Sequence, residues 1–178
     1  MNLFYKLFAK NNRENFDISN LIWSWIGSFL GLFAIAFFHR NFLDDSDLTL
    51  VLSSFGASAV LIYGAINSPL AQPKNLIGGH IISAIIGVFC YKLFGENLLF
   101  AAAIAVSSSI LVMQLTLTLH PPGGATALIA VIGTPQIHDL GYFFVIFPVF
   151  SGALILFLIA FVINNIPKNR AYPESFKN

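Results

Sequence analysis

Charged residues are scarce in this sequence. Only 10% of its 178 residues are Asp, Glu, Lys or Arg, whereas 57% are hydrophobic. This balance excludes an ordinary soluble domain and is typical of an integral membrane protein. The net charge is only +1 and the sequence has no stripe of basic residues, so it gives no reason to expect a nucleic-acid partner.

Cysteine is nearly absent, and metal-binding patterns are missing. Cys90 stands alone, so it forms no disulfide within the chain. No two histidines have helical spacing, and neither His80 nor His120 has a cysteine or carboxylate near it in the sequence. We therefore expect no metal and no cofactor. The apolar segments also lack paired carboxylates and a nucleophile with its base, which argues against an enzyme.

Long apolar segments are what the sequence does contain. Five of them carry almost no charge, namely 21–38, 48–68, 75–91, 97–119 and 140–163. Most reach the roughly 20 residues that a helix needs to cross a bilayer. The sequence therefore predicts an all-α, polytopic membrane helix bundle with four to six membrane elements.

We expect three parts along the chain. Residues 1–19 mix Leu and Phe with Lys and Arg, which suits an interfacial amphipathic segment. Residues 20–165 form the membrane domain, and residues 166–178 form a cytoplasmic tail. Both chain ends are basic, whereas the loop HRNFLDDSD after the first apolar segment is acidic. The positive-inside rule then predicts that both termini are cytoplasmic and that the number of crossings is even.

An internal repeat is visible in two short segments. FGASAVLIYG (55–64) and GGATALIAVI (123–132) align without a gap, and a turn with proline follows each. Each also lies between two long apolar segments, so the chain divides into two pseudo-repeated triads, 20–92 and 97–165. Many transporters are built from such repeats, with a broken or re-entrant helix in each half. Six crossings would make the triads inverted, whereas four would make both short segments re-entrant; the length of 48–68 favours six.

The segment TLHPPGGATALIA (118–130) carries helix breakers inside apolar sequence. Proline is tolerated in the first helical turn, so Pro121 and Pro122 predict the start of a short helix. Gly123 and Gly124 leave that turn without side chains, and the free amides of a helix start favour an anion.

The first triad has small residues at the equivalent place, Ser53, Ser54 and Gly56. We therefore expect two helix starts to face each other near mid-membrane and to form a small electropositive site. A simpler interpretation is that the glycines only permit tight helix packing.

Several blocks of the sequence resemble one known family. They are SFGASAVLIYG, SPLAQPKNLIGGHIISAIIG, LHPPGGATAL and FPVFSGALILFLIAFVINN, and they extend from about Trp23 to Asn165. The chain resembles the HPP family of integral membrane proteins, named for the tripeptide seen here as His120-Pro121-Pro122. The family is usually described as having four membrane-spanning helices and as transporters, with plastid and cyanobacterial members linked to nitrite. The resemblance implies a transporter or channel for a small inorganic anion in a bacterial plasma membrane.

Two histidines lie within the apolar segments. His80 and His120 are ionisable, with an ordinary pKa of about 6.5, so either could attract an anion or carry a proton. A lone histidine is also a common packing residue, and amides such as Gln72 and Gln114 can simply join helices. The candidate pathway residues are His120, Pro121, Pro122, Gly123, Gly124, Thr126, Ser54, Gly56, Ser58, His80, Gln72 and Gln114.

Other patterns concern packing and the surface. Small residues recur every four positions, in Gly27 and Gly31, in Gly79, Ser83 and Gly87, and in Ala101, Ala105 and Ser109. Such stripes let helices approach closely, within one chain or between copies, and a body this small suggests a homo-oligomer. We expect His39 and His138 at the surface because charged residues adjoin them. A non-transporting scaffold or sensor subunit is the alternative function.

Overall fold

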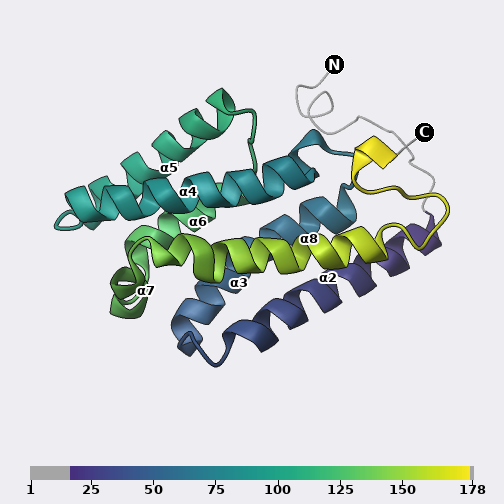
Figure 1. Ribbon diagram of the computed structural model, residues 1–178, viewed down its shortest axis with the longest axis horizontal. Coiled ribbons are helices and arrows are strands. Elements are labelled where there is room, and N and C mark those ends of the chain that lie inside the picture. Colours follow the sequence, from purple (N-terminus) through teal and green to yellow (C-terminus); the bar gives the residue numbers. More distant parts are fainter. Residues whose placement is uncertain (1–16, 177–178) are drawn as a thin grey trace, which may run out of the picture.

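The computed structural model describes residues 17–176, and these residues form helices joined by short connections (Figure 1). The segment expected to lie at the membrane surface, 1–19, falls almost entirely outside them. The helices in chain order are α2 (Ile18–His39), α3 (Asp45–Ala59), the π-helical turn η1 (Val60–Gly64), the 3₁₀ turn η2 (Pro69–Ala71), α4 (Pro73–Phe94), α5 (Leu98–Leu115), α6 (Pro121–Ile132), α7 (Pro135–Leu140), the π-helical turn η3 (Val145–Phe150), α8 (Ser151–Ile163) and the 3₁₀ turn η4 (Glu174–Phe176).

Five helices among residues 17–176 are long and apolar enough to cross a membrane. They are Ile18–His39, Asp45–Gly64, Pro73–Phe94, Leu98–Leu115 and Val145–Ile163. The sixth apolar helix, α6, has only 12 residues. At about 1.5 Å per residue it is shorter than a hydrocarbon core of about 30 Å. The predicted all-α polytopic bundle is therefore confirmed.

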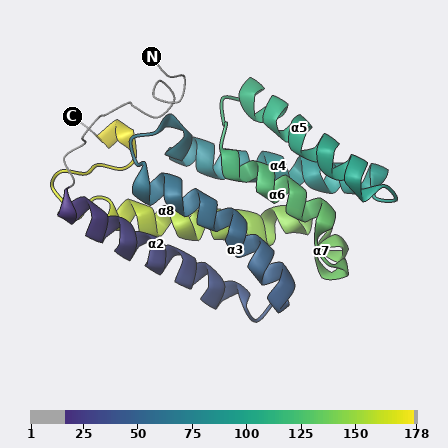
Figure 2. The same ribbon diagram turned by 180° about the vertical axis from the view of Figure 1, so that it is seen from behind.

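Successive long helices reverse direction along the bundle. Figures 1 and 2 show α2 leaving the end of the bundle where the segment after α8 also lies, α3 returning to it, and α4, α5, α6 and α8 continuing the alternation. The two ends of the described chain thus lie at the same end of the bundle. The directions alternate as they would in two inverted triads, but α6 is too short to cross by itself, so the number of passages and the repeat stay predictions.

The start of α6 lies inside the bundle. An added Cβ at Gly79 would stand 2.5 Å from Cβ of His120, the residue just before α6. Gly79 is six residues after the first residue of α4, so this contact lies about 9 Å along that helix. The prediction that Pro121 begins a short internal helix is confirmed.

The expected second helix start is absent. α3 begins at Asp45, where Asp44 caps it by accepting a hydrogen bond from the Asp47 amide at 2.8 Å. Ser53, Ser54 and Gly56 therefore lie in the middle of α3. The prediction of two helix starts facing each other is wrong. Asp44 begins the helix well before these residues, and small residues such as Ser54 and Gly56 do not by themselves start one.

The stripes of small residues are packing faces within the chain. On α4, an added Cβ at Gly87 would lie 2.6 Å from the Ala127 carbonyl oxygen, so this stripe holds α6 against α4. On α2, Gly27 and Gly31 leave room for the ring of Tyr63. The stripe of α5 is buried as well, at Ala101, Ala105 and Ser109.

Two surface predictions need correction or refinement. His39 is fully buried, where its Nδ1 donates to the Ile35 carbonyl at 2.8 Å and its Nε2 lies 2.9 Å from Ser151 Oγ. The surface prediction is wrong for His39 because α2 continues to this residue and packs against the start of α8. His138 is half-buried and stacks on Tyr91, with ring centroids 3.6 Å apart.

Candidate functional site

Five polar side chains from three helices meet inside the bundle. Ser54 and Ser58 come from α3, His80 from α4, and His120 and Thr126 from the start and first turns of α6. Each is at most 2% exposed. We call these five residues the histidine cluster. Helical spacing puts the two serines on one face of α3, and the start of α6 within the bundle brings His120 to them.

The histidine cluster is continuously hydrogen-bonded. Ser58 Oγ lies 2.8 Å from His80 Nε2 and 2.9 Å from His120 Nε2, so it joins the two rings. His80 Nδ1 lies 2.7 Å from Thr126 Oγ1, which is 2.9 Å from Ser54 Oγ. The ring centroids of His80 and His120 are 5.0 Å apart.

One backbone carbonyl fixes the direction of these hydrogen bonds. His120 Nδ1 lies 2.8 Å from the Leu70 carbonyl oxygen, which can only accept, so Nδ1 carries the proton. Nε2 of a neutral His120 must then accept, and the Ser58 hydroxyl donates to it. Ser58 Oγ in turn accepts from His80 Nε2–H, which leaves His80 Nδ1 to accept from the Thr126 hydroxyl. With both rings neutral, every ring nitrogen has a partner.

Ser54 completes the chain of hydrogen bonds. Its hydroxyl can donate to Thr126 Oγ1 or to the Pro122 carbonyl oxygen, 3.0 Å away. When Ser54 donates to Thr126, the bonds run in one direction from the middle of α3 to the Leu70 carbonyl in the connection before α4. The two hydroxyls and two rings between these ends can exchange donor and acceptor roles, whereas the Leu70 carbonyl is a terminal acceptor that passes no proton on.

The other residues of the His-Pro-Pro-Gly-Gly segment have mainly structural positions. Pro121 is exposed, whereas Pro122 is buried and contributes its carbonyl. Gly123 packs on α4, since an added Cβ would lie 2.7 Å from Ser83 Oγ, and its amide donates to the His120 carbonyl at 2.8 Å. An added Cβ at Gly124 would lie 3.7 Å from Val106 Cγ1 of α5, which is an ordinary van der Waals distance. For Gly123 the packing interpretation is therefore the better one.

Three further candidates lie away from the histidine cluster. No atom lies within 4 Å of a Cβ added at Gly56. The Gln72 side chain donates to the carbonyls of Ile66 and Ser68, both at 3.0 Å, and so holds the connection before α4. Gln114 is exposed on α5. The fold thus brings together five of the predicted polar residues but not these three.

Sequence reasoning missed the joint arrangement of the two histidines. They are 40 positions apart, so no pattern in the sequence brings them together. The spacing of Ser54 and Ser58 on one helical face was the available signal, because it marks a polar stripe on an otherwise apolar helix. The Leu70 carbonyl left no signal, since a backbone group is not visible in a side-chain pattern.

The long apolar helices around a buried polar cluster define an integral, polytopic membrane protein. A family model described as the transmembrane region of HPP proteins matches residues 13–173. The chain belongs to the HPP family.

Two curated relatives come from Dictyostelium discoideum, and both are described only as transmembrane proteins. One is 47% identical over 160 residues, which is 88% of this chain and 56% of the relative. The other is 43% identical over 160 residues, which is 88% of this chain and 51% of the relative. The chain therefore spans about half the length of these relatives. No solved structure matches it.

Proposed function

We propose that this protein is a transporter or channel for a small inorganic anion of the nitrite class. The observation that carries the proposal is the histidine cluster, in which two ionisable rings lie buried among membrane helices. Ionisable groups in that environment are costly, and they commonly mark ion and proton pathways. The nitrite class comes from the family resemblance.

The chemistry of the histidine cluster connects anion movement to a proton. In the neutral state the hydrogen bonds described above occupy all four ring nitrogens. An added proton turns one ring into an imidazolium, which attracts an anion without any buried lysine or arginine. His120 is the better candidate for this role because it adjoins the start of α6, the positive end of that helix's dipole. We therefore propose that transport depends on pH.

The remaining parts of the proposal follow from the sequence. The protein acts by transport and not by catalysis, it lies in a bacterial plasma membrane with both termini cytoplasmic, and it works as a homo-oligomer. A non-transporting scaffold or sensor subunit is the second candidate. The observation that favours it is the near-complete burial of the histidine cluster, which leaves no side chain there open to solution.

Purified protein in liposomes tests the proposal. Liposomes with the wild-type protein should take up nitrite faster than protein-free liposomes, and formate and chloride serve as the comparison ions. His120→Gln should reduce the uptake because glutamine does not become cationic. His138→Gln, the same change at a half-buried histidine outside the cluster, should not. Wild-type uptake equal to that of protein-free liposomes for all three ions would favour the scaffold or sensor subunit.

A further inference from the structure

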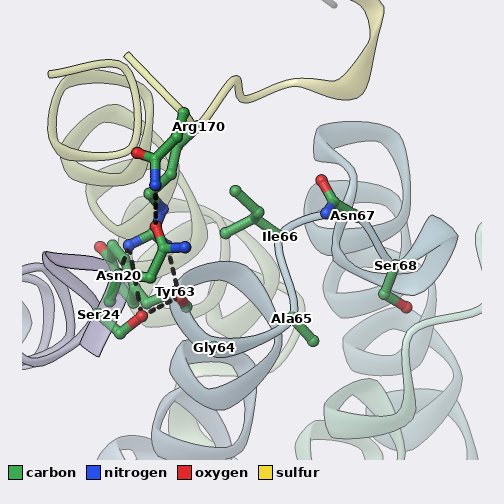
Figure 3. A pocket seen from close by; sticks show the side chains of 10 residues that line it. Asn20, Ser24, Tyr63, Gly64, Ala65, Ile66, Asn67, Ser68 and Arg170 are labelled. Carbon is green, nitrogen blue, oxygen red and sulfur yellow. Dashed lines mark hydrogen bonds between the residues drawn. The ribbon is translucent and has the colours of Figure 1, made fainter. Parts of the chain in front are cut away.

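A second polar region lies at the end of the bundle where the start of α2 meets the segment after α8. Figure 3 shows a cavity between the start of α2, the connection after η1, and the segment that follows α8. Its volume is about 560 Å³, and its lining includes Asn20, Ser24, Ser68 and Arg170. We call it the Arg170 pocket. It shares no residue with the histidine cluster.

Arg170 is a buried cation with neutral partners. Its side chain is only 9% exposed. Nη2 donates to the Tyr63 carbonyl at 2.6 Å, and Nη1 lies 3.3 Å from the Asn20 carbonyl oxygen and 3.4 Å from Ser24 Oγ. No carboxylate forms an ion pair with it among residues 17–176. Burial lowers the pKa of Arg170, which reflects the cost of keeping this charge out of water.

A helix dipole offsets part of the positive charge of Arg170. The Tyr63 carbonyl lies at the carboxyl end of the helix Asp45–Gly64, where the helix dipole is negative. That interaction uses one of the two Nη2 hydrogens, while Nε of Arg170 donates to no residue of the described chain. The free Nε–H and the second Nη2 hydrogen can still bind an oxyanion along one edge of the guanidinium.

The polar groups near Arg170 also favour the binding of an oxyanion. Asn20 Nδ2 also lacks a described acceptor, although Asn20 Oδ1 accepts from Asn169 Nδ2 at 3.3 Å. The Asp17 carboxylate is the neighbouring negative charge, and it is occupied by hydrogen bonds from the Ser19 amide and Asn169 Nδ2. Asp17 does not line the cavity.

We propose that the Arg170 pocket binds an oxyanion group, held by the guanidinium edge of Arg170 and the amide of Asn20. Its place at the end of two membrane-spanning helices gives access to two sources of this chemistry. One is a free inorganic oxyanion, and the other is the phosphate of an anionic lipid, which basic pockets between membrane helices commonly bind. The proposal does not depend on transport, because it concerns binding at equilibrium.

Thermal unfolding of the purified protein tests the proposal in two arms. In neutral detergent, sodium nitrite or sodium phosphate is titrated at constant ionic strength. In lipid nanodiscs, phosphatidylcholine is compared with a mixture that contains phosphatidylglycerol. Stabilisation by the free anions identifies the inorganic source, and stabilisation only by phosphatidylglycerol identifies the lipid phosphate.

Matched variants show whether the effect arises in the Arg170 pocket. Arg170→Gln should lower the apparent affinity by about tenfold or more, because a charge-assisted contact is lost. Lys168→Gln removes the same charge from an exposed position two residues away and should leave the affinity unchanged.

Asn20→Asp keeps the proposal testable if Arg170→Gln does not fold. It places a carboxylate in the pocket beside Arg170, so it should stabilise the protein without added anion and remove the response to anion. Absence of stabilisation in both arms, or a response that persists in both Arg170→Gln and Asn20→Asp, would overturn the proposal.

Discussion

Replacing Ser58 by alanine removes the group that joins the two histidines. His80 Nε2–H loses its acceptor and His120 Nε2 loses its donor, both in a buried site. Hydrogen bonds between membrane helices average about 0.6 kcal/mol and reach about 1.7 kcal/mol. Two such bonds give an expected loss of about 1–3 kcal/mol in the free energy of unfolding. The upper part of this range is favoured because both ring nitrogens are left unsatisfied.

Ser53→Ala is the matched control for this experiment. Ser53 lies on the same helix but is exposed, and its hydroxyl donates only to the Thr49 carbonyl one turn earlier. Since both variants change serine to alanine in α3, the difference in helix propensity cancels. Ser53→Ala should alter the free energy of unfolding by at most about 0.5 kcal/mol.

Equilibrium unfolding in mixed detergent micelles measures both variants. We expect Ser58→Ala to unfold at a clearly lower denaturant concentration than Ser53→Ala, with the wild type close to the control. Equal free energies of unfolding for the two variants, within about 0.3 kcal/mol, would refute the assignment of Ser58 as the centre of the histidine cluster.

Further predictions concern the proton, the packing and the topology. His120→Gln should flatten the pH profile of anion uptake, because glutamine does not titrate; an unchanged profile would leave His120 as a packing residue. Gly87→Val should destabilise the protein by about 1–3 kcal/mol, because α6 packs against this position. Gly56→Ala should stabilise it by about 0.5–1 kcal/mol, because the added methyl group meets no atom. Equal changes in the free energy of unfolding for these two variants would contradict the packing described. In a Cys90→Ala background, an impermeant thiol reagent should label Glu96→Cys in intact cells, and labelling only after lysis would contradict six passages.

The elements that could be predicted are those decided by local chemistry. Long apolar runs predicted the membrane helices because a bilayer requires about 20 apolar residues in succession. The pair Pro121 and Pro122 predicted the start of α6 because proline is favoured in a first turn and disfavoured later. The small-residue stripe around Gly87 predicted a close helix contact, and α6 makes that contact.

The features that could not be predicted depend on tertiary contacts. The match between the segments around Gly56 and Gly124 suggests two equivalent helix starts. In the structure, however, Asp44 begins α3 well before Gly56. His39 was placed at the surface because Arg40 follows it, whereas the approach of Ser151 buries it. Charge near a residue in the sequence does not show which side of a helix end faces the core.

The packing of the segment after α8 also could not be predicted from the sequence. Residues 166–178 were expected to form a cytoplasmic tail. In the described part, Tyr172 is fully buried and its hydroxyl donates to the Ala71 carbonyl at 2.7 Å. Arg170 enters the same end of the bundle. A short polar segment gives no periodic pattern, so its packing could not be foreseen.

Nitrite uptake by liposomes of wild-type protein, Ser58→Ala and Ser53→Ala, at equal amounts of folded protein, tests the central claim most directly. We predict uptake above that of protein-free liposomes for the wild type and Ser53→Ala, and a large loss for Ser58→Ala, because the chain of hydrogen bonds between His80 and His120 is broken. Uptake in all three preparations equal to that of protein-free liposomes, or unchanged uptake in Ser58→Ala, would contradict the account.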